Sequence, residues 1–198
     1  MDLSRLCNRI GTVSSNVGAL RLDLPVAGDR TERALIRDAQ RGSVEAFEQL
    51  FRSHWPRAYR AALLVVGDAA AAEDIAQESF LAAVRALDRF DRRRPFGPWL
   101  HRIVVNRAID WARARALRRE SFSDVELEAA GEPEPSAHAR ALADVLALLQ
   151  PEQRAVIVLR YLLEYTPGEI ARLLDLPRGT VNSRLRRGLD RLQEAVRE

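Results

Sequence analysis

The spacing of apolar residues constrains this chain most, because it is helical almost throughout. From Thr31 onward, apolar side chains recur at intervals of three and four residues, which is the period of one face of an α-helix. No segment of useful length shows the alternating pattern of a β-strand. A chain of 198 residues has room for one or two small domains. The expected fold class is therefore all-α, with two small helical domains.

Punctuation by Gly, Pro and capping residues divides the first half into four expected helices. Gly42 and Ser43 separate the first two, and the second contains Pro56, which predicts a kink or break. Gly67 and Asp68 end the second helix and cap the third. The third is expected over about 70–87 and the fourth over about 96–118, with a loop at 91–95 between them.

A composition change in the middle of the chain separates two domains. Residues 120–137 carry acidic side chains with Gly131, Pro133 and Pro135, which is typical of an exposed, flexible linker. Helical spacing resumes near Ala139, and Pro151 begins another helix. The expected organisation is an N-terminal flexible tail (1–29), a first domain (30–119), an acidic linker (120–137) and a second domain (138–198).

Charge is distributed in blocks, although the net charge is only +3. Residues 85–119 carry 11 Arg and 3 acidic residues, a net charge of +8, whereas residues 120–137 carry 6 acidic residues and no Arg. A basic block beside an acidic one favours a polyanionic partner.

Several classes of protein are excluded by what the sequence lacks. One cysteine, Cys7, rules out an internal disulfide framework and a cysteine-based zinc site, and His54, His101 and His138 are not at metal-ligand spacing. No apolar run approaches the length of a membrane span, and residues 1–28 lack the apolar core of a signal peptide. We expect a cytoplasmic protein with no metal, no cofactor and no catalytic residue.

The end of the chain carries a helix-turn-helix pattern. Thr166 to Glu169 form a capping box with proline at the first helical position, and 175–177 form a short break. The next helix has an inward apolar stripe and an outward polar face, so it can present side chains to a major groove. A solvated amphipathic hairpin is the alternative interpretation. The outward residues are Asn182, Ser183, Arg184, Arg186 and Arg187.

The basic block mixes arginine with aromatic residues, which suits DNA that is being opened. Asn106, Asp110 and Arg113 lie on one side of the fourth expected helix, and the Asn106 amide could read an extruded base. On the third expected helix, Asp74, Gln77 and Glu78 form a polar stripe. That stripe is either a solvated face or a protein-contact surface.

Three motifs together resemble the extracytoplasmic-function (ECF) sigma factors of bacterial RNA polymerase. The first is residues 72–80 (Ala-Glu-Asp-Ile-Ala-Gln-Glu-Ser-Phe), and the second is residues 99–103 (Trp-Leu-His-Arg-Ile) followed by Asn106, Asp110 and Arg113. The third is Glu-Ile-Ala at 169–171, followed by residues 177–185 (Pro-Arg-Gly-Thr-Val-Asn-Ser-Arg-Leu). Their order and spacing over about 32–195 are those of the family.

The resemblance implies a role for each site. It implies that the first domain is a sigma region 2 bundle, in which Asp74, Gln77 and Glu78 dock on the clamp helices of core polymerase. Phe90, Asn106, Asp110 and Arg113 would serve the −10 element. The second domain would be region 4, which binds the polymerase flap and reads the −35 element; there the motif adds Arg178 and Thr180 to the outward residues named above. The acidic linker would thread toward the active-site cleft and RNA exit path.

The implied function is that of an alternative sigma factor, which binds core RNA polymerase and promoter DNA, assists promoter melting and performs no catalysis. It would be a monomer when free and associated with the nucleoid in holoenzyme. Many relatives are held inactive by an anti-sigma factor, and the sequence leaves open whether this one is. Two alternatives remain: a stand-alone helix-turn-helix regulator, and a metal-dependent nuclease using Glu73, Asp74 and Glu78.

Overall fold

The computed structural model describes residues 29–121 and 137–197, so nearly all of the expected tail and of the expected linker lies outside the described residues. Within these two ranges every regular element is helical, which confirms the all-α prediction. The elements are α2 (Asp29–Gln40), α3 (Val44–Val66), α4 (Ala69–Ala86), η1 (Leu87–Arg89), α5 (Phe96–Ser121), α6 (Ala137–Ala147), α7 (Pro151–Ile157), η2 (Val158–Leu162), α8 (Pro167–Leu174) and α9 (Arg178–Arg197).

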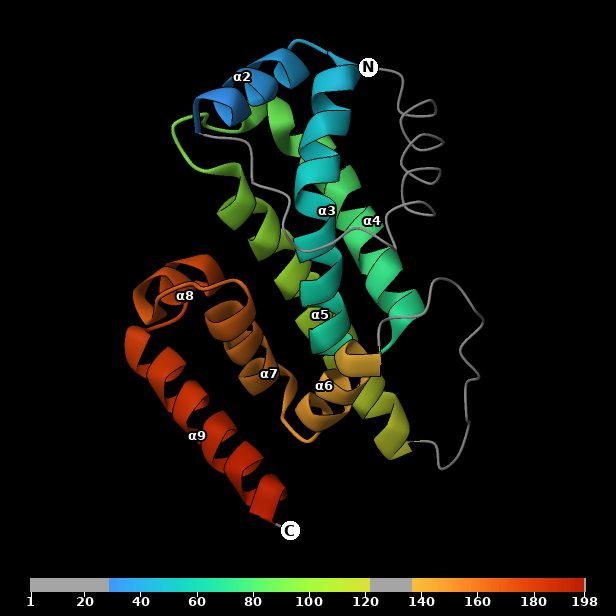
Figure 1. The fold of residues 1–198 in the computed structure, drawn as a ribbon, viewed down its shortest axis with the longest axis vertical. Helices are drawn as coiled ribbons and strands as arrows, with labels where there is room; N and C mark the ends of the chain where they lie inside the picture. The colour runs from blue at the N-terminus through green and yellow to red at the C-terminus, as the bar shows by residue number, and fades with distance from the viewer. Residues whose placement is uncertain (1–28, 122–136, 198) are drawn as a thin grey trace.

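The first domain is a bundle of α2, α3, α4 and α5, in which α3 packs against the other three helices (Figure 1). Aromatic side chains fill its core. The Phe51 ring lies 4.6 Å from the ring of Phe80 and 4.8 Å from that of Trp55, measured between centroids. Burial of such large rings is the main favourable contribution to the stability of this bundle.

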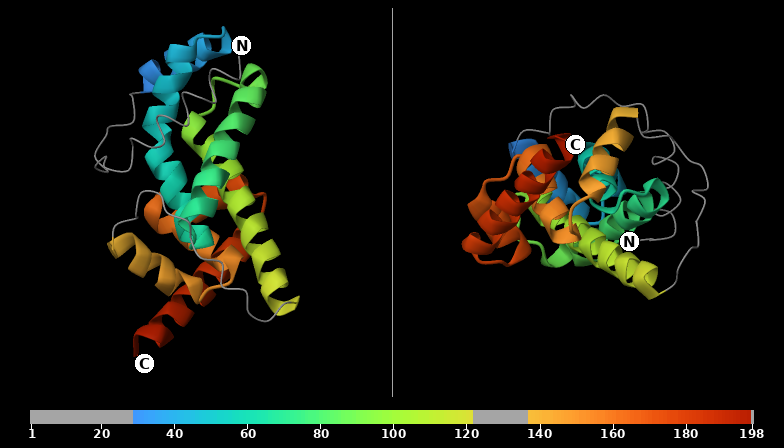
Figure 2. Two further views of the ribbon diagram at one scale, coloured as in Figure 1. Left: turned by 90° about the vertical axis from the view of Figure 1, so that its right-hand side faces the viewer. Right: turned by 90° about the horizontal axis from the view of Figure 1, so that it is seen from below.

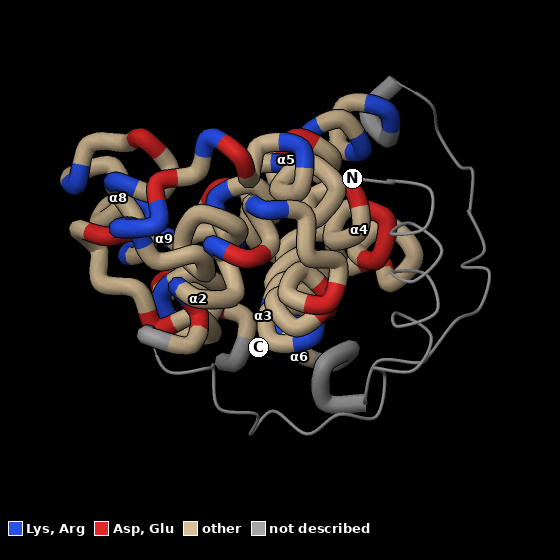
Figure 3. The backbone as a smooth tube through the Cα atoms, turned by 90° about the horizontal axis from the view of Figure 1, so that it is seen from above, with Lys and Arg blue, Asp and Glu red and all other residues tan. Residues whose placement is uncertain are grey.

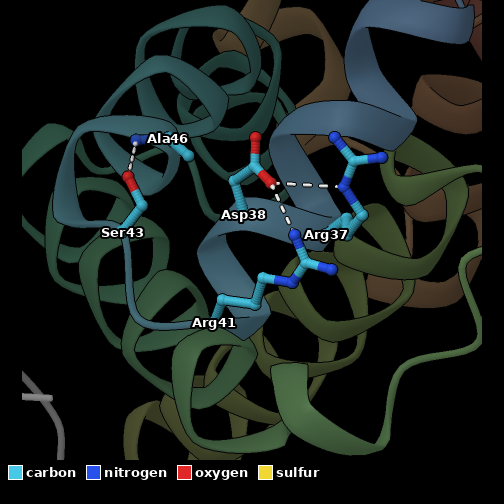
Figure 4. A network of polar contacts seen from close by, with 5 residues as sticks. All are labelled: Arg37, Asp38, Arg41, Ser43 and Ala46. Carbon is cyan, nitrogen blue, oxygen red and sulfur yellow. Dashed lines mark hydrogen bonds and ion pairs between the residues drawn. The ribbon is translucent and has the colours of Figure 1, made fainter.

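Short polar caps determine where the helices of this bundle begin. The Ser43 hydroxyl accepts a hydrogen bond from the Ala46 N–H at 3.1 Å and so caps α3 (Figure 4). Gly67 ends α3 in the left-handed region at φ 71°, a conformation that glycine adopts without steric cost. Asp68 follows at once as the N-cap of α4, accepting from the Ala71 N–H at 3.0 Å.

Two helices differ from the sequence-based expectation. α3 is continuous through Pro56, so the break does not occur there. Trp55 and Ala58 are buried on either side of the proline, and this packing compensates for the missing backbone donor. α5 begins at Phe96 as predicted and continues to Ser121, three residues beyond the expected end.

The second domain comprises α6 to α9 and packs directly on the first. α6 packs at the end of α3 that leads into α4, and α7 contacts both α3 and α5 (Figures 1 and 2). The buried apolar residues of both domains form one continuous core cluster, which includes Leu64 and Val65 of the first domain and Leu146 and Leu149 of the second. The two expected domains are therefore in contact in this structure.

Candidate nucleic-acid interface

The helix-turn-helix of α8 and α9 is built as the sequence indicated. The Thr166 hydroxyl accepts from the Glu169 N–H at 3.4 Å, and a Glu169 carboxylate oxygen accepts from the Thr166 N–H at 2.8 Å. Hydrogen bonds from the Thr166 hydroxyl and backbone hold the pKa of Glu169 below its usual range. Asp175 ends α8 in the left-handed region, and the chain turns into α9. Fully buried Ile170 and Val181 join the two helices.

α9 turns its polar face outward. Val181 and Leu185 are buried against α7 and α8, while Arg178, Asn182, Arg186 and Arg187 are exposed and Thr180, Ser183 and Arg184 are half-buried. The Ser183 hydroxyl donates to the Thr180 carbonyl oxygen at 3.0 Å, so its proton is already used inside the helix. The structure thus brings all seven predicted −35 residues to the first half of one helix. Figure 3 shows the arginine positions of α8 and α9 along the surface.

α5 carries the three predicted polar residues of the −10 face at successive turns. Asn106 is half-buried, and its amide has no hydrogen-bond partner among residues 29–121 and 137–197. An amide in that state can still bond a base edge. Asp110 and Arg113 are exposed, and their charged groups lie 3.8 Å apart. Arg113 also donates to Glu152 of α7, with Nε 2.6 Å from Oε1.

Phe90 lies inside the aromatic cluster of the first domain instead of at its surface. It is 8% exposed, and its ring centroid is 4.5 Å from that of Trp99 and 5.9 Å from that of Phe96. The Gln40 amide donates to the Phe90 carbonyl oxygen at 2.9 Å and holds this corner in place. Trp99 is half-buried, so Phe90 supports the more accessible ring from behind.

The predicted polymerase-docking stripe is the outward face of α4. Asp74 and Glu78 are exposed and Gln77 is half-buried, and Figure 3 shows the acidic stretch along this helix. The Gln77 amide donates to Glu73 at 3.0 Å. Glu78 pairs with Arg107 of α5 at 2.8 Å, which links the α4 face to α5. Phe80 is fully buried and belongs to the core.

The sequence-based reasoning missed the residues that connect the two domains. Glu152 reaches Arg113, and the Tyr165 hydroxyl oxygen lies 2.7 Å from Nδ1 of His101. Arg154 donates to the Val65 carbonyl oxygen at 2.6 Å. These contacts join positions 39 to 89 residues apart, so neither periodicity nor a local motif could have indicated them.

Two further observations concern classes of site. In the part of the chain that the structure describes, no group of three or more His, Cys, Asp or Glu residues is arranged to hold a metal ion. None of the helices described in 29–121 and 137–197 has both the length and the apolar character needed to cross a bilayer.

Comparison with known families agrees with this arrangement. Residues 50–118 match the family described as Sigma-70 region 2, and residues 139–192 match Sigma-70, region 4. The first match covers most of α3, all of α4 and most of α5, and the second covers the helix-turn-helix.

Full-length relatives share both parts. The chain is 31% identical to the ECF RNA polymerase sigma factor SigW of Bacillus subtilis over 182 residues, which cover 82% of this chain and 95% of that protein. It is 34% identical to the ECF RNA polymerase sigma factor SigM of Mycobacterium tuberculosis strain H37Rv over 165 residues, covering 83% of this chain and 84% of the relative.

Solved structures show the same fold. CnrH, in complex with the cytosolic domain of CnrY, matches with a TM-score of 0.65 at 30% identity, covering 84% of this chain and 97% of CnrH. RpoE of Bartonella quintana, in complex with the anti-sigma factor NepR, matches in fold with a TM-score of 0.63 at 23% identity, covering 76% and 96% of the two chains.

A region 2 bundle, a region 4 helix-turn-helix and relatives that align over both define a class of transcription-initiation protein. The chain belongs to the ECF family of RNA polymerase sigma factors, which direct promoter-specific transcription initiation. The alternative of a stand-alone helix-turn-helix regulator is not favoured, because it leaves the region 2 match unexplained.

Proposed function

We propose that this sigma factor divides promoter recognition between α9 and α5. The outward face of α9 carries an amide and several guanidinium groups in its first half, which suits the major groove of the −35 element. Arg side chains bond guanine O6 and N7, and Asn bonds adenine N6 and N7. Arg178, Thr180, Asn182, Ser183, Arg184, Arg186 and Arg187 make up this surface.

The second DNA-binding surface is the α5 face, which we assign to recognition of the −10 element. The unpartnered amide of Asn106 is the observation that carries this assignment, because an extruded base offers the donors and acceptors that the amide lacks in the structure. Arg113 lies 3.8 Å from Asp110, and its guanidinium is suited to a phosphate. Phe90 acts through Trp99, whose ring it supports.

Polymerase docking is assigned to the exposed acidic face of α4, formed by Asp74, Gln77 and Glu78. A second surface, which is apolar, is available for polymerase contact on region 4. It is formed by α6 and its continuation, where Leu142, Val145 and Leu148 have 41–48% of their surface exposed. We assign the acidic face to the clamp helices of the largest subunit and the apolar stripe to the flap. The sigma factor itself catalyses no reaction, and the polymerase forms the phosphodiester bonds of the RNA. We place the protein in the cytoplasm, as a monomer when free and on the nucleoid in holoenzyme.

Run-off transcription tests this function. Bacterial core polymerase is supplied with a pool of genomic promoter fragments, with and without the full chain. New discrete start sites are expected only with the chain present. Absence of both new transcripts and polymerase association would contradict the proposal.

A charge-reversal variant tests the assignment of polymerase docking to the α4 face. Asp74→Arg with Glu78→Arg should abolish co-purification with core polymerase, because two attractive charges become repulsive. Asp88→Arg with Asp91→Arg changes the same number of exposed acids on a neighbouring segment and should leave association intact. Equal association of both variants would refute the α4 assignment.

A further inference from the structure

The last residue of α2 is tied to a segment far along the chain. The Gln40 amide nitrogen donates to the carbonyl oxygens of Leu87 and Phe90, each at 2.9 Å, across 47 and 50 residues of sequence. Both partners can only accept, so the nitrogen and not the oxygen of the amide faces them. α2 lies beside η1 at this end of the bundle (Figure 1). Both N–H groups of one half-buried side chain are thus used on one short segment.

That segment has little regular structure of its own. η1 is a 3₁₀ turn of three residues, closed by a hydrogen bond of 3.0 Å from the Phe90 N–H to the Leu87 carbonyl oxygen. The carboxyl end of such a turn leaves carbonyl groups that need donors from elsewhere. Gln40 supplies these donors from α2, which is itself packed on α3. The position of Phe90 therefore depends on a side chain from another helix.

Phe90 supports the aromatic side chains next to the −10 face. Its ring centroid lies 4.5 Å from that of Trp99 and 5.9 Å, edge-on, from that of Phe96. Trp99 and Asn106 are seven residues apart on α5, so they lie on the same side of the helix, two turns from each other. A base extruded toward the Asn106 amide thus has the half-buried Trp99 ring on the same helix face. Movement of Phe90 would remove the support behind that ring.

The exposed turn at 91–95, which we call the arginine turn, also depends on Phe90. The Asp91 side chain accepts from the Arg93 N–H at 3.0 Å, and the Asp91 carbonyl oxygen accepts from the Arg94 N–H at 2.9 Å. These bonds preserve the shape of the turn, so its placement is determined where it joins the bundle, at Phe90 and at the start of α5. The turn carries three consecutive arginines, which suit a phosphate backbone.

We propose that Gln40 is a positioning residue for −10 recognition, because its amide fixes Phe90. Phe90 in turn places the Trp99 ring and the arginine turn beside the α5 face. This inference rests on the proposed function, which assigns that face to the −10 element. The Gln40 amide hydrogens are used inside the chain, so the residue acts through Phe90 and not by contacting DNA. Loss of the amide should therefore reduce discrimination between −10 sequences.

Fluorine NMR of the free full chain tests the structural step. The chain contains three tryptophans, Trp55, Trp99 and Trp111, and labelling with 5-fluorotryptophan gives each a resonance that single Trp→Phe variants assign. Gln40→Met has nearly the size of glutamine but no donor, so it should shift or broaden the Trp99 resonance while that of Trp111 is unchanged. Gln49→Met removes the same group from an exposed position on α3 and should leave the Trp99 resonance unchanged.

Promoter discrimination tests the functional step. Holoenzyme containing the full chain opens two promoter fragments that differ at one −10 base, for which the wild-type protein should discriminate about tenfold or more, as expected for one good base contact. Gln40→Met should reduce this ratio about fivefold, the effect of about one net hydrogen bond. Gln40→Glu keeps the shape but places a carboxylate opposite two carbonyl oxygens, and it should reduce the ratio at least as much. The folded fraction cancels in the ratio, because the same protein opens both promoters.

The outcomes separate this inference from the proposed function. If no −10 substitution affects opening by the wild-type holoenzyme, the proposed function is contradicted, and the inference with it. If the wild type discriminates and both Gln40 variants keep its ratio, only the inference is overturned. An unchanged Trp99 resonance in Gln40→Met would overturn it as well. Reduced discrimination in both variants, with an altered Trp99 resonance and with Gln49→Met like the wild type, would support it.

Discussion

At the residue scale, His101 has surroundings that differ strongly from water. Burial lowers the pKa of His101 to about 3, and the charges of His54 and Arg57 act in the same direction. Its Nε2 is buried without a hydrogen-bond partner among the described residues, so a proton there would gain no contact. The folded chain therefore keeps this imidazole neutral at pH values where the unfolded chain begins to protonate it.

This difference predicts acid sensitivity at unusually mild pH. The unfolded state binds the proton below about pH 6.5, so the contribution of His101 is complete above that pH and decreases as the pH falls toward 3. The free energy of unfolding should fall by about 1 kcal/mol between pH 7 and pH 5.5. Urea denaturation at both pH values measures it. His101→Gln should reduce the pH dependence, and an equal dependence in that variant would assign the effect elsewhere.

A second prediction at this scale distinguishes the roles of the Asn106 and Asn182 side-chain amides. Asn106→Ala should lower open-complex formation about ten- to hundredfold, since a good base contact contributes about 1–3 kcal/mol, while −35 duplex binding is unchanged. Asn182→Ala removes the same group from α9 and should weaken duplex binding instead. Permanganate reactivity of the melted strand and a duplex gel shift measure the two effects. Normal melting with Asn106→Ala would remove this residue from the base pocket.

At the scale of elements, the seating of α9 depends on one small residue. Gly188 is buried where α9 crosses α7, and a Cβ atom there would lie 2.7 Å from Cδ1 of Ile157. Glycine is therefore the only residue that fits at this position without displacing the Ile157 side chain. This close approach sets the position of the recognition helix relative to the rest of region 4.

Adding a methyl group at this crossing should move α9. Gly188→Ala should destabilise the chain by about 1–2 kcal/mol through overpacking, despite the better helix propensity of alanine. It should also weaken −35 binding. Gly168→Ala in α8 meets no atom within 4 Å and is the matched control, which should be neutral or stabilising. Thermal unfolding and a duplex gel shift distinguish them; indistinguishable variants would show that the crossing tolerates a Cβ.

At the scale of the whole molecule, one apolar core spans both domains, and buried Arg154 lies within their contact. Cooperative unfolding follows from a shared core, because neither half can lose its packing without exposing the other.

The free chain should therefore unfold in one calorimetric transition. Arg154→Met should separate it into two, or lower the midpoint by several degrees. Three carbonyl oxygens would lose their donor, at a combined cost of about 3 kcal/mol or more. Arg172→Met, on exposed α8, is the control and should retain the single transition. Two transitions in the wild-type chain would show that the domains fold independently.

The sequence by itself determined the helices, the capping box at Thr166 and the outward face of α9, because these follow from local hydrogen bonding and the 3.6-residue period. Only the tertiary structure decided that Phe90 is buried, that α3 continues through Pro56, and that Glu152, Arg154 and Tyr165 join the two domains. Those outcomes depend on contacts between helices that are far apart in the sequence. The hydrophobic period of a helix shows which of its faces is buried, but it does not show which other helix covers that face.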